Sequence, residues 1–300
     1  MTLVPINAVG NALSDLTRLG PVLQALPHGA RITVMIHGYK YAPGQPGLCP
    51  HDHIFSLTPK TTNARVISWP RHLGLGRDHL GIAFGWDGSG SLWRAWHMSA
   101  LAGLQLARLV DLIAASGHRV DLVGHSLGAR VALAALAHVQ AGSVGKAIFI
   151  APAAFRGQSL AALAAPAGRH VQVLNVISRE NALYDHGLEW LVAPHRWGER
   201  SLGLGLDLDH PRWTDLRIDR DAVRTTLAQL GYPIAAPTRR VCHWSGYLRQ
   251  GLFPLYRAIL SDRLALPVLG RALHADSRLT SRHGPVAELD LFPFGTPQSR

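Results

Sequence analysis

The sequence predicts an α/β fold, with a mostly parallel central sheet flanked by helices on both faces. Short apolar runs rich in β-branched residues, typical of buried strands, alternate along the chain with longer helical patterns. One such run, around Val120 to Val123, passes without a loop into an Ala- and Leu-rich helical pattern. With 300 residues, of which 47% are hydrophobic, the chain can bury a large core. We therefore expect a single domain over residues 1–300.

The remaining elements are expected on either side of that junction. Strands are predicted at residues 31–36, 64–69, 146–151, 170–177 and 213–218, and helices at 11–26, 91–116, 219–230 and towards the end of 239–260. The Gly-rich stretch 71–90 is predicted to be a loop that borders the substrate cleft. We also expect a small cap over the site at residues 194–212 and a partly mobile tail from about residue 262.

The junction at residues 119–138 has the pattern of a nucleophile elbow. Gly124-His125-Ser126-Leu127-Gly128 lies between the strand and the helix, which places Ser126 at the tip of a sharp turn. Such a turn strains its serine, and a Cβ at Gly124 or Gly128 would collide with the neighbouring strand or helix. The backbone N–H of Leu127 would point at a developing oxyanion. A serine helix cap is the plainer interpretation, but the preceding strand and following helix favour the elbow.

A second oxyanion donor is expected after the strand at residues 31–36. This strand runs into His37-Gly38-Tyr39, and the donor would be the backbone N–H of Tyr39 or of Lys40. The residues predicted to contact substrate are His37, Gly38, Phe84, Trp86 and His125. Of these, Phe84 and Trp86 are candidate walls of the cleft that fit plain packing equally well.

Acyl transfer by a serine also needs a base, and a carboxylate that fixes the tautomer of that base and stabilises the imidazolium. The base is expected in a loop near the C-terminal end of the sheet, downstream of the acid. The candidates are His186, His195, His210, His243, His274 and His283. Because His243 stands in a compact Cys-His-Trp-Ser-Gly-Tyr motif before a helix, we predict that it is the base, with His210 as the alternative.

The acid is sought in the loop after the strand at residues 170–177. The positions at the usual spacing hold Asn181 and Ala182, neither of which is acidic. Asp185 and Glu180 flank them, so Asp185 is predicted to complete the triad, with Glu180 as the alternative. Either carboxylate could instead be a solvated loop group or a helix N-terminal charge.

Composition excludes several other classes of protein. The formal net charge is +11, but the basic residues are scattered and form no block, so we expect no nucleic-acid partner. No secretory signal and no apolar run of about 20 residues is present, so no stable membrane insertion is expected. Cys49 and Cys242 make no disulfide framework, and we expect a cytoplasmic protein. The His51-Asp52-His53 stretch lacks a third ligand nearby and is interpreted as a polar loop.

These residues together resemble the α/β-hydrolase superfamily, and most closely its bacterial serine-esterase or lipase-like branch. The His-Gly-Tyr loop, the GHSLG elbow and the His-Trp motif carry the resemblance, which covers about residues 31–260. It implies Ser126 as nucleophile, His243 as base, an acid after the strand at 170–177, and oxyanion donors at Leu127 and Tyr39. It also implies that no metal or organic cofactor is needed. Ala182 departs from the pattern, because an acidic residue is expected near this position.

The leading hypothesis is hydrolysis of a small-molecule carboxylic ester, or a thioester, through an acyl-enzyme on Ser126. The alternative is a catalytically degenerate fold that acts as a ligand-binding or scaffold module, because the acid is unsettled. A third hypothesis is association with anionic membrane surfaces, based on the charge and on the apolar residues between 252 and 260.

Overall fold

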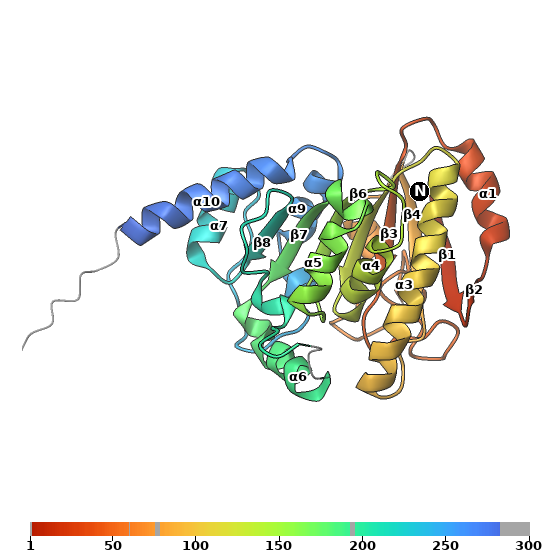
Figure 1. Ribbon diagram of the computed structural model, residues 1–300, viewed down its shortest axis with the longest axis horizontal. Coiled ribbons are helices and arrows are strands. Elements are labelled where there is room, and N and C mark those ends of the chain that lie inside the picture. Colours follow the sequence, from red (N-terminus) through yellow and green to blue (C-terminus); the bar gives the residue numbers. More distant parts are fainter. Residues whose placement is uncertain (1, 60, 76–78, 193–195, 283–300) are drawn as a thin grey trace, which may run out of the picture.

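The computed structural model describes residues 2–59, 61–75, 79–192 and 196–282, and an eight-stranded sheet runs through its centre (Figure 1). The strands lie in the order β2-β1-β4-β3-β5-β6-β7-β8. Their bounds are β1 Thr2–Val9, β2 Ala12–Leu13, β3 Arg31–Ile36, β4 His79–Gly85, β5 Val120–His125, β6 Val144–Ile150, β7 Gln172–Ile177 and β8 Trp213–Arg217. All neighbouring strands are parallel except β1 and β2. The predicted mostly parallel sheet is confirmed.

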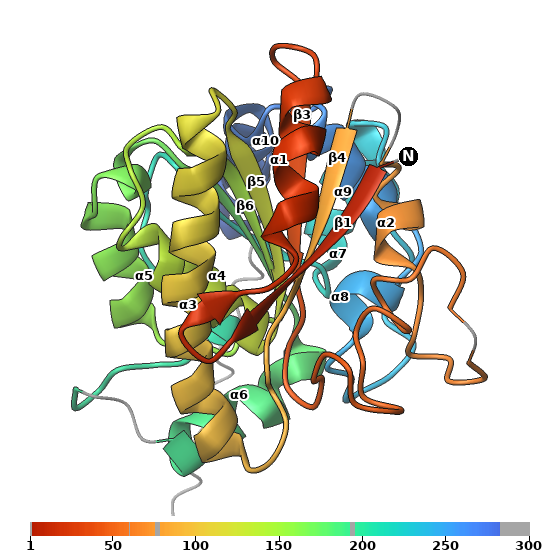
Figure 2. The same ribbon diagram turned by 90° about the vertical axis from the view of Figure 1, so that its right-hand side faces the viewer.

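Helices cover both faces of this sheet (Figure 2). One face carries α1 Leu16–Ala25, α3 Leu92–Ala115, α4 Leu127–Leu136 and α5 Arg156–Ala164. The other carries α2 Trp69–His72, α7 Asp221–Gln229, α8 Ser245–Leu248, α9 Leu252–Leu260 and α10 Leu266–Arg282. Helix α6 Ala182–Val192 lies beyond the C-terminal ends of the strands, and short 3-10 turns are η1 Ala167–Arg169, η2 Arg179–Asn181 and η3 Leu202–Leu204.

Each face of the sheet has its own apolar core. Helices α3 and α4 approach closely in the first core, because a Cβ at Gly103 would lie 2.4 Å from Ala134 Cβ. By length and composition, α3 is the one described helix that could cross a membrane, and half of its most apolar window is buried inside the protein. A helix in the core of a soluble protein can have the same length and composition. The buried residues of α3 pack against the sheet and α4. The apolar residues of α9 are likewise buried, in the second core.

Two predictions about residues 64–90 are wrong. The stretch 64–69 forms a turn rather than a strand, because Ser68 caps α2 by accepting the backbone N–H of Arg71 at 3.4 Å. Trp69, expected to end a strand, is the fully buried first residue of this helix. The Gly-rich stretch 71–90 contains β4, which pairs with both β1 and β3. A Cβ at Gly81 of β4 would lie 2.3 Å from Leu75 Cδ1, so the glycine that made this stretch look like a loop lets Leu75 pack directly on the strand.

The C-terminal part of the described chain is also more ordered than expected. Where a mobile tail was predicted from about residue 262, α10 packs against α7 and β8 and buries Leu266 and Leu269. The apolar side chains at these positions are spaced on one helical face, and their burial holds the helix in place. Only the residues after 282 lie outside the part described at this end.

Candidate active site

Ser126 occupies the strained turn that the sequence predicts between β5 and α4. Its backbone angles are φ 55° and ψ −124°, a conformation that L-residues rarely adopt. The end of β6 holds the turn: Ser126 donates its N–H to Ile150 O at 3.0 Å and accepts the N–H of Ala153 at 3.0 Å. The predicted nucleophile elbow is therefore present in the structure.

Three glycines leave the space that this turn needs. A Cβ at Gly124 would lie 2.7 Å from the carbonyl carbon of Gly128, and a Cβ at Gly128 would lie 2.3 Å from Ile36 O. A Cβ at Gly38 would lie 2.8 Å from Ser126 Cβ. These distances are well inside van der Waals contact, so the elbow helix, the end of β3 and the serine are packed as closely as the backbone allows.

Two backbone N–H groups near Ser126, at Leu127 and Tyr39, have no acceptor among the described residues. The N–H of Lys40, the alternative donor, is already donated to Gly88 O at 2.9 Å. The structure thus favours Leu127 and Tyr39 as the pair that could hold an oxyanion, with Lys40 excluded.

His37 supports this loop and does not face substrate, contrary to its prediction as a contact residue. Its Nε2 accepts the backbone N–H of Trp86 at 3.0 Å, so Nδ1 carries the proton and donates to Gly38 O at 2.9 Å. The ring stacks on Trp86, whose Nε1 donates to His37 O at 3.0 Å. Burial lowers the pKa of His37 to about 3, which keeps the ring neutral.

Ser126 opens into a cavity of about 430 Å³. The predicted residues that line it are Gly38, Tyr39, His125, Ser126, Leu127 and His243. Phe84 and Trp86 do not line it, because both are buried in the first core. The rest of the wall is mainly apolar and comes from Lys40, Tyr41, Ile54, Leu92, Ala153, Leu183, Tyr184, Gly187, Leu188, Leu191, Trp244 and Tyr247.

Helix α6 forms the cover of this cavity in place of the predicted cap at residues 194–212. Five of the lining residues belong to α6, and Trp93 at the start of α3 donates its Nε1–H to Leu191 O at 2.7 Å. The described part of the predicted cap, residues 196–212, does not line the cavity and instead buries Ser201, Leu202 and Leu206 beside α6 and β7. Residues 194 and 195 lie outside the described residues.

His243 reaches the cavity from the segment that precedes α8. His125 donates its Nε2–H to His243 O at 3.1 Å, and the two rings lie 4.7 Å apart. The ring of Tyr184 stacks on the other side of His243, also at 4.7 Å. Burial, and secondarily the neighbouring His125, hold the pKa of His243 well below 6.5. No hydrogen bond joins Ser126 and His243 among the described residues, and in free enzymes this contact often forms only with substrate bound.

Asn181, which the sequence analysis passed over for lack of a charge, is the residue that orients His243. Its Oδ1 lies 2.6 Å from His243 Nδ1. An amide oxygen can only accept, so Nδ1 carries the proton and Nε2 is left as the basic nitrogen. Asn181 stands at the usual spacing for the triad acid, and this spacing was the signal that could have identified it.

The two carboxylates predicted to complete the triad do not contact His243. Glu180 is buried in an ion pair with Arg249 and accepts the hydroxyl of Ser178 at 3.0 Å. Asp185 accepts the hydroxyl of Ser201 at 3.0 Å, and its carboxyl interacts with the side chain of Asn181. Both predictions are corrected because η2 and the first turn of α6 turn the side chains of 180 and 185 away from the base.

The other histidine candidates lie elsewhere or outside the description. His210 lines a different cavity beside α10, and its Nδ1 accepts the N–H of Arg212 at 3.3 Å. His195 and His283 lie outside the described residues. His51 contacts Asn7 Oδ1 at 2.7 Å, and the described residues contain no group of His, Cys, Asp or Glu side chains that could hold a metal ion.

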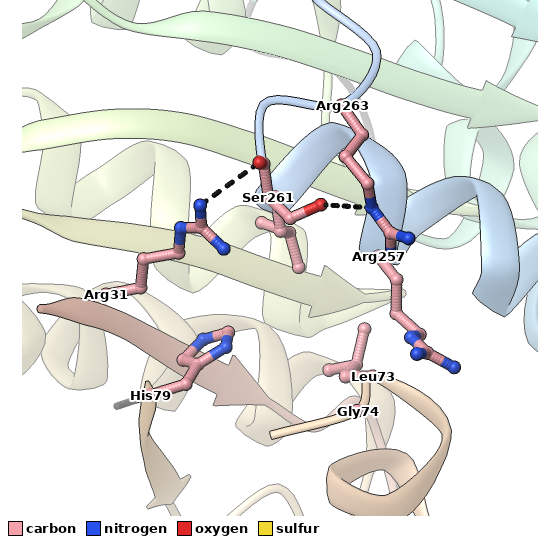
Figure 3. A pocket seen from close by; sticks show the side chains of 8 residues that line it. Arg31, Leu73, Gly74, His79, Arg257, Ser261 and Arg263 are labelled. Carbon is pink, nitrogen blue, oxygen red and sulfur yellow. Dashed lines mark hydrogen bonds between the residues drawn. The ribbon is translucent and has the colours of Figure 1, made fainter. Parts of the chain in front are cut away.

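A second cavity, of about 300 Å³, contains Ser261 and His79. It lies at the N-terminal ends of β3 and β4, at the opposite end of the strands from Ser126 (Figure 3). There, Ser261 Oγ accepts Arg263 Nε at 3.0 Å, and Ser261 O accepts Arg31 Nη2 at 3.1 Å. His79 Nε2 is hydrogen-bonded to Thr33 Oγ1 at 2.8 Å, and no hydrogen bond joins His79 and Ser261 among the described residues.

Comparison with known proteins agrees with this geometry. The family model described as "Alpha/beta hydrolase family" matches residues 33–290, so the chain belongs to the α/β-hydrolase family. A comparison with curated protein sequences finds no match. Among solved structures, the crystal structure of Aspergillus fumigatus lipase B is 14% identical and matches 84% of this chain and 61% of its own, with a TM-score of 0.38. The chain thus spans less than two thirds of that lipase, and we draw nothing about activity from so distant a likeness.

Proposed function

We propose that the protein is a serine hydrolase that cleaves a small-molecule carboxylic ester through an acyl-enzyme on Ser126. The observation that carries this proposal is the strained Ser126 backbone at φ 55°, placed at the mouth of a cavity that also contains His243. Strain of this kind persists only where the surrounding structure imposes it, and it is concentrated at functional sites.

The chemistry follows from the groups around the serine. Ser126 Oγ attacks the ester carbonyl carbon while His243 Nε2 takes the hydroxyl proton. The carbonyl oxygen becomes an oxyanion that accepts the N–H groups of Leu127 and Tyr39. The tetrahedral intermediate expels the alcohol, which receives the proton from His243. Water, deprotonated by His243, then attacks the acyl-enzyme and releases the acid and the free serine.

The cavity supports an ester with an apolar acyl group. Leu183, Leu188 and Leu191 on α6 line the cavity together with Ile54 and Leu92. Among the described residues that line the cavity, Lys40 is the single one with a permanent charge, so they offer no pair of charges to a doubly charged substrate. A thioester would use the same groups with a thiol as the leaving group.

Hydrolysis of p-nitrophenyl butyrate by Ser126→Ala tests this proposal. We expect the substitution to lower kcat by several orders of magnitude, because no other group can form the acyl-enzyme. Ser143→Ala is the matched control: this buried serine hydrogen-bonds Gln140 O at 2.7 Å beside the start of β6, away from the cavity. Wild-type rates in Ser126→Ala would overturn the proposal.

The second candidate is a ligand-binding module without turnover, favoured by one observation. The group that orients His243 is a neutral amide, and no carboxylate among the described residues contacts the imidazole. If the protein is such a binding module, it should bind an apolar ester saturably without releasing the alcohol. Steady turnover by the wild-type protein excludes it.

A further inference from the structure

We propose that Asp185 is a positioning residue that acts on His243 through the amide of Asn181. From the serine outwards the residues are Ser126, His243, Asn181 and Asp185, so the carboxylate stands one side chain further from the base than in a triad. This inference rests on the proposed function, because it concerns how the base of that reaction is oriented.

Local geometry places Asn181 and Asp185 together. Asn181 ends η2, and α6 begins at the next residue without a break, so side chains four positions apart lie on the same side of the turn. Both side chains are about 2% exposed. The interaction with the Asn181 side chain is one of the contacts that lower the pKa of Asp185, against burial, which raises it to about 7.

One oxygen of the Asp185 carboxyl accepts a hydrogen bond, and the other has no hydrogen-bond partner among the described residues. Its Oδ1 accepts the Ser201 hydroxyl at 3.0 Å and is pressed against Gly203, where a Cβ would lie 1.8 Å away. Its Oδ2 is buried without a hydrogen-bond partner in the described part of the chain. A buried carboxylate oxygen without a partner is costly. The side chain of Asn181 interacts with this carboxyl, so a small shift of its NH₂ towards Oδ2 would supply the missing donor.

This arrangement decides which end of the amide faces the base. An amide can present its oxygen or its NH₂ to a ring nitrogen. A carboxyl accepts hydrogen bonds from the NH₂ end, so Asp185 draws Nδ2 towards itself and leaves Oδ1 for His243 Nδ1–H. The reversed amide would donate to Nδ1, move the proton to Nε2 and remove the nitrogen that must accept the serine proton. A carboxylate behind Asn181 therefore keeps His243 in the productive tautomer.

An exchange of the two side chains tests the relay, because Asn and Asp have nearly the same shape. Asp185→Asn should lower kcat for p-nitrophenyl butyrate at least about tenfold with little change in KM, since the amide loses its preference for one orientation. The double variant Asn181→Asp with Asp185→Asn should recover most of that loss. A carboxylate then touches His243 directly, so the acid limb of its kcat/KM profile should lie at higher pH than that of the wild type.

Three controls separate the outcomes. Ser201→Ala removes the other partner of Asp185 and should change the urea midpoint but not kcat or the pH profile. Asp185→Ser, smaller and still able to hydrogen-bond, replaces Asp185→Asn if that variant does not fold, and the same loss of kcat is expected. The charged and titratable neighbours, His186 and Glu189 near Asp185 and His125 near His243, stay unchanged throughout.

Wild-type kcat in Asp185→Asn, or a double variant no faster than Asp185→Asn, would overturn the relay while leaving the serine mechanism intact. Absence of turnover in the wild-type protein would instead count against the proposed function itself. The two failures are therefore distinguishable.

Discussion

The strained backbone conformation of Ser126 is stabilised by the residues around it, including its glycine neighbours. A non-glycine residue at φ 55° is disfavoured by roughly 1–3 kcal/mol. The turn persists because β6 holds both backbone groups of Ser126, and because Gly124, Gly128 and Gly38 let neighbouring backbone come close. These requirements are local, so the motif predicted them from the sequence.

A methyl group at Gly128 should therefore be poorly tolerated. We expect Gly128→Ala to lower the free energy of unfolding by about 1–3 kcal/mol, because the new Cβ would meet Ile36 O at 2.3 Å. Gly187→Ala in α6 is the control, since a Cβ there meets nothing within 4 Å, and a gain of about 0.5–1 kcal/mol is expected. Urea denaturation of both variants measures this. Equal stability of the two would contradict the packing described for the elbow.

The partner of His243 was not predictable in the same way. Glu180, Asn181 and Asp185 are adjacent in the sequence, and which one faces the base depends on the rotation of η2 and α6 relative to His243. The charges of Glu180 and Asp185 also favoured them over Asn181 in the prediction, because a carboxylate is the usual partner of a catalytic histidine. The spacing of Asn181 from the strand marks it as a candidate, but its role became clear only from the 2.6 Å distance between its Oδ1 and His243 Nδ1.

At the scale of elements, buried strands with β-branched residues were predicted well and irregular ones were not. β3, β5, β7 and β8 lie within about two residues of their predicted positions. β4 was missed because Gly81 and Gly85 resemble loop residues, although both have close neighbours that leave no room for a side chain. α6 was missed because a polar loop was expected where the acid was sought.

Helix α10 gives a prediction at this scale. Leu269 is fully buried in the second core, whereas its neighbour Val268 is 41% exposed. Leu269→Ala should lower the free energy of unfolding by about 2–5 kcal/mol, the usual range for a buried leucine. Val268→Ala should change it by less than about 0.5 kcal/mol. Urea midpoints check both values, and a Leu269→Ala protein as stable as Val268→Ala would mean that α10 does not pack as described.

At the scale of the whole molecule, the fold keeps several buried histidines neutral. Burial lowers the pKa of His37 to about 3 and of His125 to about 4, and holds that of His243 well below 6.5. In the opposite direction, burial raises the pKa of Asp185 to about 7 and of Asp121 to about 6. The sequence shows many histidines but not which of them the two cores enclose.

These shifts predict how stability depends on pH. Below pH 6.5 the unfolded chain binds protons at histidines that the folded protein keeps neutral, so acid favours unfolding; the two aspartates oppose this, because the folded protein holds their protons more tightly. Each net proton changes the free energy of unfolding by about 1.4 kcal/mol per pH unit. With His79, whose pKa burial also lowers to about 4, four histidines oppose the two aspartates, so stability should fall from pH 6.5 to 4.5. Asp185→Asn should make the fall steeper, and urea midpoints that rise over this range would contradict the assignment.

The activated serine is tested most directly by covalent labelling. The intact protein is treated with a fluorophosphonate, and the modified peptide is located by mass spectrometry. We expect one adduct per chain, on Ser126, lost in Ser126→Ala and much slower in His243→Ala, because the hydroxyl needs its base to attack phosphorus. A folded wild-type protein that gains no adduct, or gains one on another residue, would contradict the assignment of Ser126 as the nucleophile.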